Sequence, residues 1–255
     1  MYDMPDEIDV QADGPLRIIT LNRPDDLNAV NDALHEGLSR LWTRLSADRD
    51  ARVAVITGAG RAFSAGGDFT YLQELAKDRD LRAKSISDGR ELVLGMTRCR
   101  IPVIAAVNGP AVGLGCSIVA LSDMVYMGEK TYLADPHVQV GLVAADGGAL
   151  TWPLQISLLQ AKEFAFTGQR IPARRALELG LANHVVEDPL SEALAAAKNI
   201  LDQPQKAIEA TKRLINIQLE RTVLAAIDFA LSAEEMTFQS DDFQANIARL
   251  TAGKS

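Results

Sequence analysis

Two glycine-rich stretches could place backbone N–H groups around one reactive oxygen. The first, RAFSAGGDF at 61–69, follows an apolar run at 53–57, and the second, NGPAVGLGC at 108–116, follows an apolar run at 103–107. A segment with helical character comes after each, so free N–H groups would lie at each turn. Two such groups aimed at one carbonyl oxygen would stabilise negative charge that forms there. Each stretch alone is also compatible with an ordinary strand-to-helix loop.

A histidine and an aspartate further along the chain could move protons. Asp146 lies nine residues after His137 and directly before two glycines. If the loop folds back, the carboxylate could bond one imidazole nitrogen, fix the tautomer and stabilise the imidazolium. The other nitrogen could then activate water or move a proton at a carbon atom. Alternatively, Asp146 caps a helix that begins at Gly147, and His137 is a partly buried bystander.

The elements that would position these residues follow a strand-strand-helix rhythm. Apolar runs and turn signals predict strands at 8–13, 16–21, 52–57, 103–107, 124–128, 131–134 and 184–186. Periodicity and stop signals predict helices at 31–47, 85–98, 149–159, 161–167, 173–179, 190–201, 205–219, 223–237 and 242–250. The chain therefore begins as mixed α/β and becomes helical after residue 148.

Several polar residues of these elements are expected to lie in solvent. Segment 71–82 is charged and is expected to be mobile. His35, next to an acidic neighbour on the first helix, is expected to be exposed. Glu234 and Glu235 could reach the site from a late helix, but exposed charge is the prediction for both.

Composition bounds the class of protein. The chain has 255 residues, 47% of them hydrophobic, which suits one large domain or a domain with a helical extension. A net charge of −8 and few aromatic residues disfavour nucleic acid and anionic membranes as partners. Cys99 and Cys116 have no metal-ligand spacing, so no metal is expected. Without a signal-like N-terminus or a long apolar run, the cytoplasm is the expected location.

The two turns together resemble those of the crotonase superfamily, also called the enoyl-CoA hydratase/isomerase family. Leu-Asn-Arg-Pro at 21–24 and Ala-Asp-Pro at 134–136 add to the likeness, which covers roughly residues 8 to 250. The resemblance implies an α/β spiral of strand-strand-helix units with two roughly perpendicular sheets. It implies a core domain at 1–200 and a helical region at 201–255 that closes the active site and supports a homotrimer or a dimer of trimers.

The resemblance also assigns roles to the glycine turns. Gly67 and Leu114 match the two residues whose N–H groups form the family's oxyanion hole. The leucine side chain is expected to narrow the pocket. The resemblance implies further substrate contacts around the turns, at Ala62, Ala65, Gly66, Asp68, Gly113, Ser117 and Pro136. It implies no cofactor beyond coenzyme A as part of the substrate.

The acid/base positions depart from the hydratase pattern. A typical hydratase of this family has two glutamates, and this chain has Ser117 and His137 at the matching positions. The match makes His137 the expected general acid/base, with Asp146 as its orienting partner. Ser117 could position water or the acyl group, or simply pack within a helix.

Two acidic residues bear on the substrate. Relatives often have a lysine after Arg-Pro that suits CoA phosphates, and this chain has Asp25 and Asp26 there. Carboxylates repel a polyphosphate, although Arg23, Arg61 and Lys254 could compensate. The leading hypothesis is an acyl-CoA enzyme that works through an enolate. A His/Asp pair at this spacing also resembles the family's β-diketone hydrolases, such as 6-oxocamphor hydrolase, which need no CoA. A third hypothesis is a non-catalytic scaffold or RNA binder.

Overall fold

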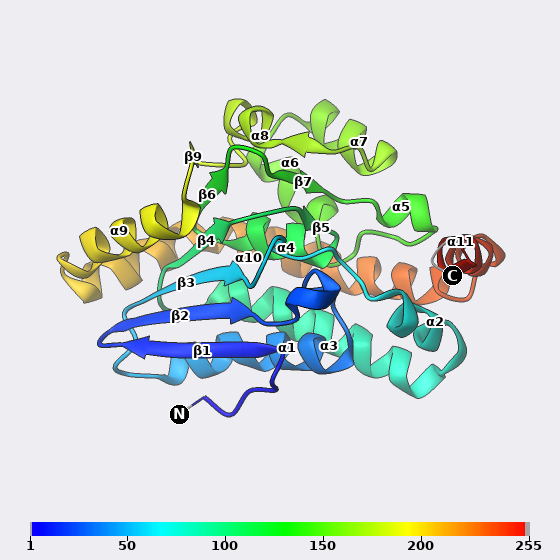
Figure 1. Ribbon diagram of the computed structural model, residues 1–255, viewed down its shortest axis with the longest axis horizontal. Helices are drawn as coiled ribbons and strands as arrows, with labels where there is room; N and C mark the ends of the chain where they lie inside the picture. The colour runs from blue at the N-terminus through cyan, green and yellow to red at the C-terminus, as the bar shows by residue number, and fades with distance from the viewer. Residues whose placement is uncertain (1, 253–255) are drawn as a thin grey trace.

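The computed structural model describes residues 2–252, and Figure 1 shows two β-sheets surrounded by helices. Lys254 lies outside the described residues. The strands are β1 (Ile8–Asp13), β2 (Leu16–Leu21), β3 (Val53–Gly58), β4 (Val103–Val107), β5 (Ala111–Val112), β6 (Met124–Gly128), β7 (Tyr132–Ala134), β8 (Ile171–Pro172) and β9 (His184–Val186). The helices are η1 (Pro24–Asp26), α1 (Asp32–Ala47), α2 (Phe69–Lys77), α3 (Arg79–Arg98), α4 (Leu114–Leu121), α5 (His137–Val140), α6 (Gly148–Gln155), α7 (Leu158–Thr167), α8 (Ala173–Leu179), α9 (Pro189–Leu201), α10 (Gln205–Thr237) and α11 (Asp241–Ala252).

The larger sheet carries the strands that lead into the glycine turns. Its order is β1-β2-β3-β4-β6-β9, with β1 and β2 antiparallel and every other pair parallel. A smaller sheet has the order β5-β7-β8. Because β3 and β4 are parallel neighbours, their carboxyl ends meet at one edge of the sheet, and both glycine turns begin there. The mixed α/β fold and the strand-strand-helix rhythm are confirmed.

The two faces of β3 belong to different hydrophobic clusters. Ala54 and Ile56 pack in the main core with residues of α1, α3 and α10, whereas Val53 and Val55 pack beneath α9. This alternation follows from the two-residue period of a strand. With both faces covered, β3 is buried along its whole length. The strand thus gives the first turn a rigid base.

The segment expected to be charged and mobile is helical, and it forms α2 and the start of α3. Asp68 caps α2 by accepting hydrogen bonds from the N–H groups of Thr70 and Tyr71, at 2.9 and 3.4 Å. Asp78 caps α3 in the same way, which extends this helix upstream of the predicted start at residue 85. Tyr71 and Leu75 bury one face of α2. Two caps and an amphipathic face outweigh the charge of the segment.

The positions at which one C-terminal helix ends and the next begins differ from the prediction. The helices expected at 205–219 and 223–237 are one helix, α10, because no helix-breaking residue lies between them. The break expected near residue 160 comes earlier, where Ser157 caps α7. Figure 1 shows α10 running from the α9 side of the molecule to α11 and α2. Within residues 2–252, no helix combines the length and apolar character that a membrane span needs.

Candidate active site

The two glycine turns lie side by side and are joined by hydrogen bonds. The Ser64 N–H donates to the Pro110 carbonyl at 3.1 Å, and the Val112 N–H donates to the Ser64 carbonyl at 2.9 Å. Gly66 and Gly113 both have positive φ, +88° and +51°. A Cβ on Gly113 would lie 3.5 Å from the Gly66 Cα, and one on Gly66 would lie 3.1 Å from the Val112 carbonyl oxygen. Glycine at both positions therefore permits the close approach of the turns.

Two amide groups at these turns are free to bind a ligand. Gly67 precedes the N-cap of α2, and Leu114 is the first residue of α4, where an N–H has no partner within the helix. Among the residues that the structure describes, neither N–H has a protein acceptor. Both residues line a cavity of about 220 Å³. This arrangement suits an oxygen that becomes negative during reaction.

The other residues predicted around the turns divide into two groups. The residues that line the cavity are Ala65, Gly66, Gly113 and Pro136. Those that do not are Ala62, Asp68 and Ser117. The Ala62 carbonyl accepts from Asn28, and Asp68 caps α2 and pairs with Arg23, whose nitrogen is 3.3 Å away. Both residues help to hold the turn, and their predicted contacts with the substrate stay predictions.

His137 forms a buried ion pair with Asp135, a residue that the sequence argument placed only within a motif. The His137 Nδ1–H donates to Asp135 Oδ1, and Gly148 N–H donates to Asp135 Oδ2 at 3.0 Å. Burial works against charge on both side chains, but their mutual attraction outweighs it. The pKa of Asp135 is therefore lowered, and the carboxylates of Asp135, Asp146 and Glu234 raise the pKa of His137 to about 10. At neutral pH the imidazole is charged.

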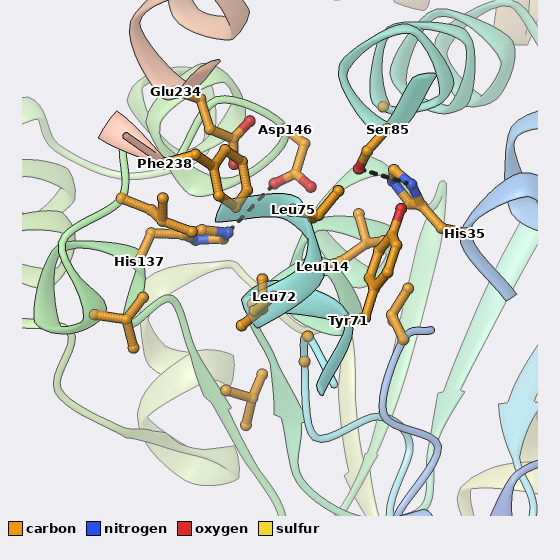
Figure 2. A pocket seen from close by; sticks show the side chains of 18 of the residues that line it. His35, Tyr71, Leu72, Leu75, Ser85, Leu114, His137, Asp146, Glu234 and Phe238 are labelled. Carbon is orange, nitrogen blue, oxygen red and sulfur yellow. Dashed lines mark hydrogen bonds and ion pairs between the residues drawn. The ribbon is translucent and has the colours of Figure 1, made fainter. Parts of the chain in front are cut away.

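Asp146 faces the imidazole through a folded-back loop, as predicted, but it is not the residue that orients the ring. Its Oδ1 lies 3.8 Å from His137 Nε2, the nitrogen that faces away from Asp135 (Figure 2). Ser117 lies behind it, and its hydroxyl has two acceptors in reach, the same oxygen at 3.3 Å and the Gly113 carbonyl at 3.2 Å. The predicted orienting partnership of Asp146 with His137 is corrected, because Asp135 holds Nδ1. The capping alternative is also wrong, since α6 has no side-chain cap and Asp135 receives its first N–H.

Glu234 enters the site from α10, so the prediction that it is exposed is wrong. It is 8% exposed and lines the cavity beside Asp146. Burial and the charge of Asp146, opposed by His137, raise the pKa of Glu234 to about 8. The sequence held a signal, because Glu234 continues the apolar stripe formed by Val223, Ile227, Leu231 and Phe238. A carboxyl group within such a stripe faces the interior.

His35 also faces the cavity, so the prediction that it is exposed is wrong. It is 6% exposed, and its Nδ1 lies 3.4 Å from the Ser85 hydroxyl (Figure 2). Tyr71 lies near it, with ring centroids 6.4 Å apart. Leu38 and Trp42 follow His35 at helical spacing, which indicates a buried face of α1. His184 lies on β9 with its side chain exposed, and its ring stacks on Tyr126.

Comparisons with known proteins identify the family. The model of a family described as enoyl-CoA hydratase/isomerase matches residues 12–252. A probable enoyl-CoA hydratase of Mycobacterium tuberculosis is 31% identical over 253 residues, 95% of this chain and 96% of the relative. A probable mitochondrial enoyl-CoA hydratase of Dictyostelium discoideum is 30% identical over 90% of this chain and 82% of the relative. The crystal structure of an enoyl-CoA hydratase/isomerase from Mycobacterium paratuberculosis has a TM-score of 0.97 and 72% identity, over 97% of this chain and all of that one.

Proposed function

Because the chain belongs to the enoyl-CoA hydratase/isomerase family, we propose that it acts on an acyl-CoA thioester through an enolate, and that the reaction is hydration of a 2-enoyl group. One observation carries the proposal. Two free backbone N–H groups line the same cavity as the charged His137 imidazole and the Asp146 carboxylate beside it. The two N–H groups can donate to the thioester oxygen. The acidic and basic side chains can exchange protons at the carbon atoms next to it.

The oxyanion hole consists of the Gly67 and Leu114 N–H groups. Negative charge develops on the thioester oxygen when water adds to the conjugated double bond, and the two donors stabilise it. Loss of one donor of this kind typically costs about 3 kcal/mol of transition-state stabilisation. The helix starts behind both donors add positive potential at the same place.

His137 and Asp146 divide the proton transfers between them. Asp146 accepts a proton from the attacking water, whose oxygen bonds to the β-carbon. The His137 imidazolium gives its Nε2 proton to the α-carbon as the enolate collapses. Asp146 is then protonated and His137 neutral, and proton transfer from Asp146 to His137 Nε2 through one bridging water spans the 3.8 Å between them and restores both groups. This division replaces the glutamate pair of typical hydratases.

Glu234 and Ser117 support Asp146 from two sides. Glu234 is neutral below a pKa of about 8, so its hydroxyl can donate a hydrogen bond to water or substrate next to Asp146. Ser117 fixes the other side by its hydrogen bond to Oδ1. Ser117 is therefore a positioning residue in this proposal and makes no contact with the substrate.

Cleavage of a carbon–carbon bond in a cyclic β-diketone is the second candidate. The acidic pair favours it, because Asp25 and Asp26 lie on η1, whose Pro24 would be 3.1 Å from a Cβ on Gly60 in the first turn. Among the residues that the structure describes, Asp26 pairs with Arg23 at 2.7 Å and Asp25 has no ion-pair partner. A polyphosphate bound here would be repelled. In this reaction Asp146 would activate water toward a ketone, and the oxyanion hole would hold the enolate that leaves.

A substrate screen by mass spectrometry tests the proposal. The protein is offered 2-enoyl-CoA thioesters and CoA-free cyclic β-diketones in separate reactions. Gain of one water by the thioester, with the acyl skeleton intact, is the expected result. Ring opening of the free diketone without action on any thioester would move the protein to the second candidate, and no reaction in either would revive a non-catalytic role.

The homotrimer or dimer of trimers is part of the same proposal. Five large apolar side chains of α10 are exposed on the single chain: Leu214, Ile215, Leu224, Phe229 and Met236. Burial of such side chains between copies would remove them from water. Light scattering that reports a monomer at micromolar concentration would contradict it. The division of the chain near residue 200 and the cytoplasmic location stay predictions.

A further inference from the structure

A second group of polar side chains lines the cavity, and the proposed proton transfers do not use it. His35 of α1, Tyr71 of α2 and Ser85 of α3 are 6%, 6% and 8% exposed. Figure 2 shows them gathered on one side of the cavity, with His137 and Phe238 on the other. We call these three residues the inner cluster. The wall around it is apolar, formed by Leu75, Ile86 and Leu231.

His35 is neutral and has one nitrogen without a partner. Burial lowers the pKa of His35, although the carboxylates of Asp146 and Asp88 oppose the effect. Nδ1 lies beside the Ser85 hydroxyl, and within the described part of the chain Nε2 has no hydrogen-bond partner. When the hydroxyl donates to Nδ1, the ring hydrogen sits on Nε2. A buried donor then faces open space.

Gly89 keeps that space open. A Cβ at this position would lie 4.0 Å from His35 Nε2 and 3.9 Å from the Leu231 side chain, with no nearer neighbour. A methyl group would therefore fit, so packing does not demand glycine. Glycine within a helix costs about 0.5–1 kcal/mol of stability relative to alanine. The missing side chain leaves room for a ligand atom next to Nε2.

Tyr71 is a second neutral donor in the inner cluster. Burial raises the pKa of Tyr71 to about 12, and Ser85 is its hydrogen-bonding neighbour. Its hydroxyl also lies 3.5 Å from the Asp32 carboxylate, a long contact. A hydrocarbon chain that filled the cavity would offer no acceptor to the His35 Nε2–H, whereas the Tyr71 hydroxyl keeps its contact with Asp32. An unsatisfied buried donor of this kind costs about 1–3 kcal/mol.

We propose that the inner cluster binds a hydrogen-bond-accepting oxygen on the acyl group, a carbonyl or hydroxyl remote from the thioester, so that the enzyme selects oxygenated acyl chains over plain alkyl chains. The inference rests on the proposed function, because the oxyanion hole fixes which end of the substrate lies near His137. The inner cluster takes no part in bond making. It acts on selectivity, which is the ratio of the kcat/KM values for an oxygenated and a plain alkyl acyl chain.

Matched substrates measure that ratio. Pairs of 2-enoyl-CoA thioesters of equal chain length are used, one member with a keto group in place of a distal methylene, and the keto position is varied. At the best position we expect wild-type protein to favour the keto member by about 100-fold or more in kcat/KM. His35→Leu should lower this preference at least tenfold. His184→Leu, at the exposed third histidine, is the matched control and should leave it unchanged.

A second variant protects the test against misfolding. Gly89→Ala adds one methyl group in the open space and favours the helix, so the fold should be kept. It should lower kcat/KM for the keto member more than for the alkyl member. Equal preference in the wild-type protein at every keto position, or an equal loss on both members in His35→Leu and Gly89→Ala, would overturn the inference.

A binding measurement separates this inference from the proposed function. If no thioester is turned over, the proposed function fails, and the ¹⁵N signal of His35 Nε2 decides the inference. A short keto-acyl thioester of N-acetylcysteamine should shift that signal, whereas the methylene analogue should not. The chain has three histidines, so loss of the signal in His35→Leu assigns it. No shift with either probe would overturn the inference.

Discussion

The two imidazoles that face the cavity are both buried, yet one is positively charged and the other is neutral. His137 has the Asp135 carboxylate on Nδ1 and the Asp146 carboxylate near Nε2, and the pKa of its ring rises to about 10. His35 has a serine hydroxyl on Nδ1 and nothing on Nε2 among the described residues, so burial lowers the pKa of its ring. Burial disfavours the charged form in both cases. The partner on one nitrogen therefore decides the charge.

This difference gives the two sides of the cavity different capacities. A charged imidazole next to a carboxylate can give and recover a proton within one turnover. A neutral imidazole with a free N–H can only offer a directional hydrogen bond. The same residue type thus serves proton transfer on one side and recognition on the other. Four changes would break or sharpen this contrast.

Replacement of His137 should have the largest effect. His137→Gln keeps a polar side chain but removes the proton donor, and we expect kcat to fall about 10³-fold, a value within the range for a general acid/base. His35→Gln should lower kcat/KM by no more than about tenfold, because it only weakens binding of the acyl group. Steady-state hydration assays check both. Equal losses in the two variants would remove the functional contrast between the rings.

Replacement of Asp135 should make His137 resemble His35. Asp135→Asn keeps the shape of the side chain and can still accept the Gly148 N–H, but it removes the charge that sustains the imidazolium. We expect the pKa of His137 to fall from about 10 toward its ordinary value and kcat to fall about 100-fold. Imidazole ¹⁵N shifts measured against pH report the pKa. An unchanged pKa would show that Asp146 and Glu234 suffice to hold the charge.

The charge of His137 should also make the free energy of unfolding depend on pH. Because its pKa is higher in the folded protein than in the unfolded chain, the folded state binds the extra proton. The stabilisation is complete below about pH 6.5 and is lost as pH rises toward 10, with about 3 kcal/mol lost by pH 9. Urea unfolding at several pH values measures it, with His137→Gln as the reference that lacks this term. A parallel pH dependence in the two proteins would contradict the assignment.

The acidic pair outside the cavity should give the smallest effect. Replacing Asp25 and Asp26 with Asn removes two exposed charges near the first turn. If CoA binds there, affinity for an acyl-CoA should rise about two- to tenfold at low salt, and the gain should shrink as salt is added. Calorimetry with a non-reactive acyl-CoA measures it. Unchanged affinity at low salt would place the phosphates elsewhere.

Local signals in the sequence were enough to predict most of the strands and helices. The alternation in β2 and the apolar runs of β4 and β6 predicted those strands with their observed bounds. Asn31 and Gly180 marked the start of α1 and the end of α8, where they cap the helices. Failures came where charge hid an amphipathic face, as in α2, or where a break was placed inside the continuous helix α10 without a helix-breaking residue.

Residue types and order along the chain determined the two glycine turns, the missing glutamate pair and the presence of a histidine in its place. They did so because turns and helix starts depend on neighbours within a few residues. The tertiary structure alone decided which carboxylate holds His137, that Glu234 and His35 face the cavity, and that Ser117 lies behind Asp146. These contacts join residues far apart in the sequence, such as His35 and Ser85, which are 50 positions apart. Charge states follow from such neighbours, and no local pattern specifies them.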